Sequence, residues 1–435
     1  MSQPAQTSNA IITRNVEKDA SIKQRVEQPE ADIGAPSVKL DPDEVPTNWS
    51  ARKKWAATLV IVLMTATITF TSSIHTAAIG GVSKAFGCSK TVATLPVTTF
   101  LLGFATGPLL FAPLSEVLGR TLIFRIVLFL FFCFNLGCAL APSIEALLIL
   151  RFLHYWIVTI LSGIVYIAIW FFLPETYVTV LLQWKKAKAG IPPVRLSFKD
   201  QYATCLTRPW IMLFTEPILF TLGLYSAFIW GILYLDFTAY PVVFQQSRHW
   251  SQGSSGLSFL GIGVGMAIAT ASSPWINDLH GAVVRKIGPK PEARLPHLII
   301  LAWVIPVALF WFGWTASPPT HWALPIAAGI PFGIGFVTLF LGTNAYLSDC
   351  YGRFSASAWA ANAVLRSLFS AGFPLFARQM YLHMGTPWAS STLGFIAIGM
   401  APVPWVLWKW GPWLRERSRF HLWTVELEKA DEVAA

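Results

Sequence analysis

Charged residues are scarce in this chain of 435 residues. Only 12% of its residues are Asp, Glu, Lys or Arg, whereas 54% are hydrophobic and 14% are aromatic. A soluble globular domain usually carries about 25% charged residues, so this chain has too little polar surface to cover a fold in water. The composition excludes an ordinary soluble globule and predicts a protein whose apolar surface faces lipid.

Signals for metal, nucleotide and catalytic sites are also missing. The five cysteines are scattered without the close spacing of a metal site, and we expect them to be free thiols. The sequence contains no phosphate-cradling glycine-rich loop and no His, Cys and Asp set typical of catalysis. These absences disfavour ATP-driven transport and enzymatic activity, and we expect neither a metal nor another cofactor.

The net charge of +10 does not indicate nucleic-acid binding, because no basic face is interleaved with exposed aromatic residues. Basic residues are concentrated instead in alternate connections between long apolar runs. Lys185, Lys186 and Lys188 lie in the connection 178–208, whereas no Lys or Arg occurs at 316–321. Since basic residues favour the cytoplasmic side of a membrane, the pattern predicts that both termini are cytoplasmic and that the number of spans is even.

The apolar runs give the expected fold class. A run of about 20 apolar residues can cross the hydrocarbon core, and about ten such runs predict an all-α polytopic membrane protein. The candidate spans are 55–80, 92–113, 122–142, 155–174, 210–236, 254–275, 297–316, 322–346, 358–382 and 389–410. Small residues four apart, Gly261 with Gly265 and Gly329 with Gly333, predict surfaces where two membrane helices pack closely.

The runs divide into two sets of unequal size. We expect a disordered cytoplasmic tail at 1–50, a bundle of about four spans at 51–177, a cytoplasmic loop at 178–208, a bundle of about six spans at 209–412 and a cytoplasmic tail at 413–435. Internal duplication, which is common among secondary transporters, produces equal halves. The unequal layout therefore indicates that two spans are absent from the first bundle.

Several motifs resemble those of a known family. The stretch "GPLLFAPLSEVLGR" at 107–120 resembles the loop between spans two and three of the major facilitator superfamily. The stretches "LPETY" (173–177), "RPWIMLFTEPILF" (208–220), "PEARLP" (291–296) and "YLSDCYGRFSASAWAANAVLRS" (346–367) resemble the twelve-spanner, fungal drug:proton antiporter branch. The resemblance implies the major facilitator fold and an efflux pump in the plasma membrane. It would export a small organic compound, such as a drug, toxin or secondary metabolite, using the proton gradient and no obligate protein partner.

The resemblance also locates the missing spans. In "LILRFLHYWIVTIL" at 148–161, the start of the family's span four runs directly into a sequence that resembles span six. The rest of span four, the next loop and span five have no counterpart, although losing two spans preserves the sidedness of later loops. The shortened chain is either a working, reduced transporter, or a gene-model error or degenerate allele. The competing function is that of a non-transporting membrane protein, either a truncated relic or a sensor that binds a ligand without moving it.

Acidic residues inside apolar runs are candidates for proton coupling, because a charge in hydrocarbon is costly and requires a reason. Glu216, directly before a proline, is either an acid that titrates as it is dehydrated or a helix-end acid paired with Arg208 or another base. Asp236 lies at the far end of the same predicted span, where we expect the membrane interface.

The resemblance adds three candidates for coupling or gating. The acid, turn glycine and base of the loop motif correspond to Glu116, Gly119 and Arg120, and such an acid–base pair can hold two helix ends together and release them. Arg151 matches a span-four arginine implicated in proton coupling, but the glycine that should follow it is replaced by the sequence His154–Tyr155–Trp156.

Other polar residues are candidates for the substrate cavity. His75 titrates near neutral pH and is expected in the first span, where it either serves a proton or substrate, or packs through a hydrogen bond. Arg125 either snorkels to the interface or pairs with an acid. Arg366 matches a family arginine of span eleven, with either a structural or a cavity role.

Overall fold

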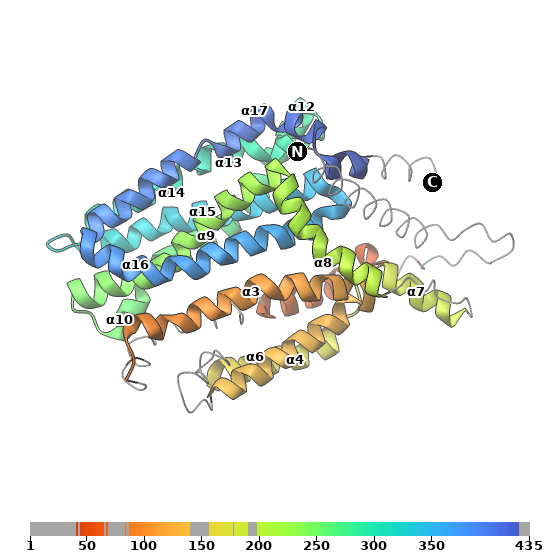
Figure 1. The fold of residues 1–435 in the computed structure, drawn as a ribbon, viewed down its shortest axis with the longest axis horizontal. Coiled ribbons are helices and arrows are strands. Elements are labelled where there is room, and N and C mark those ends of the chain that lie inside the picture. Colours follow the sequence, from red (N-terminus) through yellow and green to blue (C-terminus); the bar gives the residue numbers. More distant parts are fainter. Residues whose placement is uncertain are drawn as a thin grey trace, which may run out of the picture. The chain divides into compact units, whose positions relative to one another are not determined.

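The computed structural model describes residues 41, 44–64, 67, 83, 87–139, 156–176, 178–189 and 198–425. Every regular element within these residues is a helix, which confirms the predicted all-α class. The chain divides into two compact units (Figure 1). We call residues 1–72 and 107–211 the N-terminal unit, and residues 73–106 and 212–435 the C-terminal unit.

The N-terminal unit is built around a helical core. Its described part contains a helix at 51–64, the end of α3 (Lys90–Leu118), α4 (Arg120–Ala139), α6 (Trp156–Phe172), α7 (Val178–Lys188) and most of α8 (Phe198–Thr215). Helices α4 and α6 lie side by side (Figure 1). Leu128, Val165 and Ile169 form a buried apolar cluster with Val60 of the helix at 51–64. The apolar stretches of these helices therefore do pack together as the hydropathy pattern predicts.

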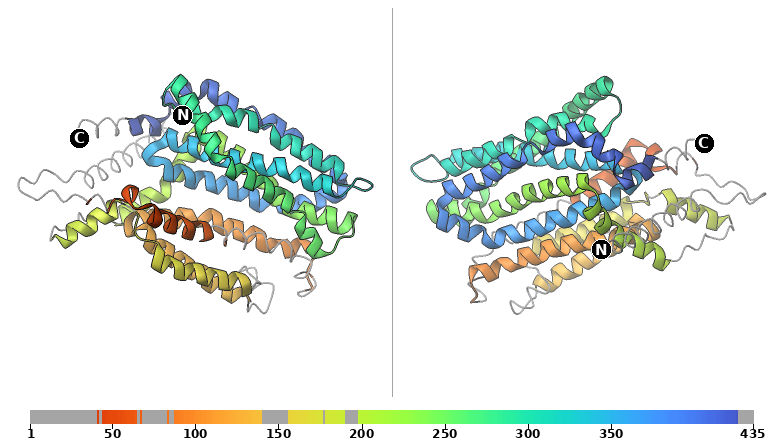
Figure 2. Two further views of the ribbon diagram at one scale, coloured as in Figure 1. Left: turned by 180° about the vertical axis from the view of Figure 1, so that it is seen from behind. Right: turned by 45° about the horizontal axis from the view of Figure 1, so that its top comes forward.

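The C-terminal unit holds most of the described helices. They are α9 (Pro217–Pro241), η2 (Val242–Ser247), α10 (Gln252–Leu257), α11 (Leu260–Ala271), α12 (Ser273–Ile287), η3 (Pro291–Arg294), α13 (Leu295–Leu301), α14 (Val304–Thr315), α15 (Ala323–Tyr351), η4 (Gly352–Phe354), α16 (Ser355–Met400) and α17 (Val403–Glu416). Helix α9 is buried along most of its length. Its largest packing partner is α16, and the views of Figure 2 show the same helices from two further directions.

The membrane-spanning segments of the C-terminal unit agree with the predicted ones. Five segments are long and apolar enough to cross a bilayer, at Pro217–Ser247, Gly253–Ala271, Pro291–Thr315, Ala323–Tyr351 and Ser355–Glu416. The last of these is interrupted at Gly385, whose backbone angles (φ 74°, ψ 156°) are not helical, so it supplies two crossings. The six candidate spans from 210 to 410 each fall on one of these helices. Much of the predicted first span lies outside the described residues.

Helices α11 and α15 pack at close range through glycine. A Cβ atom at Gly261 or Gly265 would overlap the backbone oxygen of Ile326 or Ile330, respectively. On the facing helix, a Cβ atom at Gly333 would overlap the backbone oxygen of Ile262. These contacts are those expected from small residues spaced four apart.

We expect Gly265→Ala to destabilise the protein, because the added methyl group forces the α11 and α15 backbones apart. Overpacking of this kind costs about 1–3 kcal/mol. Gly263 of the same helix is the matched control, because a Cβ atom there has no neighbour within 4 Å. Thermal unfolding in detergent, followed through the 20 tryptophans, should show a lower Tm for Gly265→Ala and no loss for Gly263→Ala. Equal Tm values for both variants would contradict the close packing.

Candidate functional site

Glu216 lies where α9 begins. A residue that precedes proline is biased toward extended backbone, and Glu216 has φ −105° and ψ 102°, with Pro217 as the first helical residue. Its side chain is buried. The carboxylate accepts a hydrogen bond from the Tyr351 hydroxyl (3.2 Å) at the end of α15, and from the backbone N–H of Phe420 (3.5 Å). Glu216 therefore connects the start of α9 with the segment that follows α17.

An ion pair joins two further segments of the C-terminal unit. Arg415 of α17 binds Glu292 of η3 through two bonds, Nε to Oε1 at 2.8 Å and Nη2 to Oε2 at 2.7 Å. The side chains are 14% and 4% exposed, so the pair is mostly hidden from water. His421 lies 3.3 Å from the same guanidinium and donates its Nδ1–H to the Cys350 carbonyl at 2.8 Å.

We use the name C-terminal network for these contacts; its members are Glu216, Glu292, Tyr351, Arg415, Phe420 and His421. The sequence analysis selected Glu216 alone from this set. Glu292 lies in the quoted "PEARLP" motif, which was the available signal for it. Arg415 lies in no motif quoted above, so its sequence neighbourhood gave no signal for it.

Asp236 lies inside the membrane-spanning part of α9. The helix continues past Asp236, because the candidate span begins at Pro217 and ends at Ser247, and the expected interface position stays a prediction. The residue is 4% exposed, and Tyr240 and Tyr381 are close enough to interact with it electrostatically. Within the part of the chain that the structure describes, its carboxylate has no hydrogen-bond or ion-pair partner.

Arg366 lies in the first part of α16, also inside the membrane helices. It is 9% exposed, and its guanidinium carbon lies 4.3 Å from the ring centre of Trp230 and 5.1 Å from that of Phe340. The C-terminal unit thus holds a buried acid, Asp236, and a buried base, Arg366. Among the described residues, no ion pair joins them.

The loop motif of the N-terminal unit has a partner that sequence reasoning did not select. Gly119 has a positive φ of 95°, as the predicted turn requires. Glu175 of the "LPETY" motif accepts hydrogen bonds from the backbone N–H groups of Arg120 and Thr121 (both 3.1 Å), and from that of Thr176 (2.9 Å). Its carboxylate therefore caps the start of α4, where the helix dipole favours a negative charge.

Two other predicted residues can be placed only in part, and two lie outside the described residues. The guanidinium of Arg125 in α4 lies 4.1 Å from the Trp170 ring of α6. Glu116 lies in α3, and its side chain is outside the description. His75 and Arg151 lie outside the described residues, as do residues 148–155 of the predicted junction between spans.

Glu175→Ala should destabilise the N-terminal unit by about 1–3 kcal/mol, because the variant leaves two backbone N–H groups at the start of α4, one of them that of the buried Thr121, without their acceptor. Glu175→Gln, which keeps one acceptor oxygen, should lose less. Glu416→Ala removes an exposed acid and serves as the control. The readout is thermal unfolding in detergent. A Glu175→Ala variant as stable as Glu416→Ala would show that the cap does not stabilise the fold.

An ion pair also joins residues near the end of the predicted N-terminal tail to α7. Lys185 of α7 donates to Asp41 and Glu44, both at 2.7 Å. The bond to Asp41, followed by that to Glu44, raises the pKa of Lys185, and the bond from Lys185 lowers the pKa of Glu44. Since the carboxylates are exposed, we expect this pair to add little stability.

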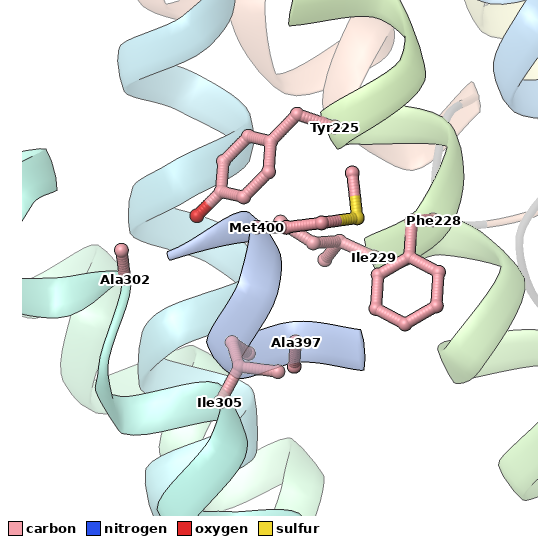
Figure 3. Close-up of a pocket in the computed structure, with 7 residues that line it drawn as sticks. All are labelled: Tyr225, Phe228, Ile229, Ala302, Ile305, Ala397 and Met400. Atoms are coloured by element: carbon pink, nitrogen blue, oxygen red, sulfur yellow. The ribbon is translucent and has the colours of Figure 1, made fainter. Parts of the chain in front are cut away.

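One small pocket lies among the helices of the C-terminal unit (Figure 3). Its lining is almost entirely apolar and consists of Tyr225, Phe228, Ile229, Ala302, Ile305, Ala397 and Met400. It has room for about one water molecule. None of the candidate charges lines it, and it is too small for an organic substrate.

Comparison with known proteins gives the family. A sequence model described as Major Facilitator Superfamily matches residues 154–374. The chain is 39% identical to the Major facilitator superfamily multidrug transporter mdrA of Aspergillus fumigatus, over 86% of this chain and 74% of that protein. The chain belongs to the Major Facilitator Superfamily. As a member of this superfamily, it is a multi-pass membrane protein of a transporter family.

Other superfamily members agree with this assignment. The MFS-type efflux pump MFS2 of Trichophyton rubrum is 36% identical over 86% of this chain and 75% of its own length. The efflux pump FUB11 of Gibberella moniliformis is 35% identical over 85% of this chain and 74% of its own length. A solved structure, described as the human organic anion transporter MFSD10 (TETRAN), has a TM-score of 0.53 at 17% identity, and covers 82% of this chain and 100% of that one. It shows the shared fold.

The alignment with mdrA also bears on chain length. The alignment extends over 447 positions. It includes only 86% of the 435 residues of this chain. The remaining positions are gaps in this chain, so mdrA contains residues that have no counterpart here.

Proposed function

We propose that this chain is an efflux transporter that exports a small, partly hydrophobic organic compound by proton-coupled alternating access. The observation that carries the proposal is the similarity to mdrA, a multidrug transporter, over 86% of this chain. Other relatives are named efflux pumps. In this proposal the protein lies in the plasma membrane with both termini in the cytoplasm, and substrate binds near the bilayer midplane.

The contacts at helix ends support alternating access. Glu175 holds the ends of α6 and α4 together, and the Arg415–Glu292 pair joins α17 to η3. Each contact is local and polar, so it can break and reform as helix ends move. We assign these contacts to the stabilisation of one state of the transport cycle.

The proton-coupling role is best filled by Asp236. Glu216 already accepts two hydrogen bonds at the start of α9, whereas the Asp236 carboxylate has no partner among the described residues. An ionisable group inside membrane helices marks a functional site by default. A carboxyl group of this kind can gain and lose a proton as its access to water changes.

Flux through purified protein tests the proposal. Proteoliposomes with an acidic interior should accumulate members of a panel of labelled neutral, cationic and anionic aromatic compounds, well above empty liposomes. A protonophore should abolish the accumulation. Accumulation that survives the protonophore would reject proton coupling. Binding without flux for every compound would reject the pump and favour the ligand-binding relic or sensor, an alternative that the shorter chain supports.

A further inference from the structure

Arg366 lies inside an aromatic cage and has no ion-pair partner among the described residues. Rings from α9, α15 and α3 approach its guanidinium carbon, at 4.3 Å for Trp230, 5.1 Å for Phe340 and 5.8 Å for Phe104. All of these residues belong to the C-terminal unit. Arg366 is 9% exposed, and no carboxylate or carbonyl among the described residues accepts a hydrogen bond from it.

The neighbouring polar groups are also short of acceptors. The indole Nε1 of Trp230 is buried without a hydrogen-bond partner, as are the hydroxyls of Ser367 and Ser370. Ser370 lies one helical turn after Arg366 and thus on the same face of α16. Arginine and tryptophan are donors only. The oxygen of Asn362, one turn before Arg366, is an unpartnered acceptor that cannot match this number of donors.

A carboxylate would satisfy this set of donors. A guanidinium presents a planar fork that matches a carboxylate through two parallel bonds. The cage keeps the cation in place from the sides, and its rings give an apolar surrounding whose edges can contact an aromatic ligand. Burying a cation without an anion in a membrane bundle costs free energy. An anion that binds to the cation would offset this cost.

We propose that Arg366 is a substrate-binding residue whose guanidinium binds the carboxylate of a small aromatic acid. This assignment rests on the proposed transport function, because it names the substrate class of the same protein. Trp230 donates its indole N–H to the same carboxylate. A merely structural Arg366 would fill the cage without any preference for an anionic ligand.

The test compares each carboxylate with its uncharged amide, using the full-length protein purified in detergent. The pairs are benzoate and benzamide, 1-naphthoate and 1-naphthamide, and indole-3-carboxylate and indole-3-carboxamide. Equilibrium dialysis at pH 7 should show at least one carboxylate that binds about tenfold or more tightly than its amide, as expected for a charge-assisted bidentate contact. Arg366→Met should remove the preference, and Arg366→Lys, a point charge without the fork, should retain part of it.

Arg378→Met is the matched control, because it makes the same substitution in the same helix outside the cage. It should keep the wild-type preference. Without ligand, Arg366→Met should unfold at a Tm no lower than the wild type, since removing a buried cation also removes its desolvation cost. Three results would overturn the site: no carboxylate preference in any pair, a preference that persists in Arg366→Met, or a marked loss of Tm in that variant.

The binding and flux measurements together distinguish a failure of the Arg366 site from a failure of the proposed transport function. If the carboxylate preference is present but proteoliposomes show no flux, the pump is rejected and the Arg366 site stands. If neutral compounds are transported and no carboxylate is preferred, the site is rejected and the pump stands.

Discussion

Arg415→Met should be strongly destabilising, with a loss of about 3–5 kcal/mol, because it leaves a buried carboxylate without its partner. The Glu292 side chain is only 4% exposed, and both of its oxygens bind the Arg415 guanidinium. Methionine cannot replace either bond. Thermal unfolding of the purified protein in detergent measures the effect as a lower Tm.

Two further variants separate the contribution of the Arg415–Glu292 ion pair to stability from that of other contacts made by residues near the end of α17. Arg417→Met removes an exposed arginine that stacks on Trp413 at 3.9 Å, and it should cost no more than about 1 kcal/mol. The double variant Glu292→Gln with Arg415→Met should recover part of the lost stability, because no unpaired charge remains. If the double variant is as unstable as Arg415→Met alone, the loss comes from packing and not from the unpaired Glu292.

The spans of the C-terminal unit could be predicted because hydropathy reports on a local property. Each apolar run is long enough to cross lipid as a helix, which satisfies the backbone polar groups within the run itself. The same applies to Gly261, Gly265, Gly329 and Gly333, since helical spacing alone places them on one face. The positive φ of Gly119 also follows from the short turn that its motif requires.

The contacts of the charged residues could not be predicted, because they join segments that are far apart in the chain. Arg366 is surrounded by rings from positions 104, 230 and 340, and nothing in its own neighbourhood indicates them. Glu292 and Arg415 are likewise separated by more than a hundred residues.

The position of Asp236 within its helix was misjudged for a different reason. The apolar run 210–236 was read as one span, which put Asp236 at its end. Proline at 217 instead starts a new helix, and the π-helical turn η2 extends the span to Ser247. The helix therefore continues past Asp236, and the acid lies in a buried part of it and not at its end.

Asp236→Asn should abolish accumulation of substrate by a pH gradient while leaving downhill equilibration intact. One proton exchanged per substrate across one pH unit supplies about 1.36 kcal/mol, which corresponds to a tenfold concentration ratio at a clamped membrane potential. Asparagine keeps the shape of the side chain but cannot carry a proton, so the ratio should fall to about one. The measurement is the steady-state ratio of labelled substrate in proteoliposomes with an acidic interior.

Two variants make this result specific to the buried acid. Asp236→Glu retains a titrating carboxyl and should keep part of the accumulation. Asp278→Asn makes the same substitution at an exposed position of α12 and should behave like the wild type. Because the carboxylate has no partner among the described residues, its loss breaks no contact, and Asp236→Asn should not lower the Tm. If Asp236→Asn still accumulates substrate tenfold, Asp236 is excluded as the coupling group. Glu216 would then be the remaining candidate of these two acids.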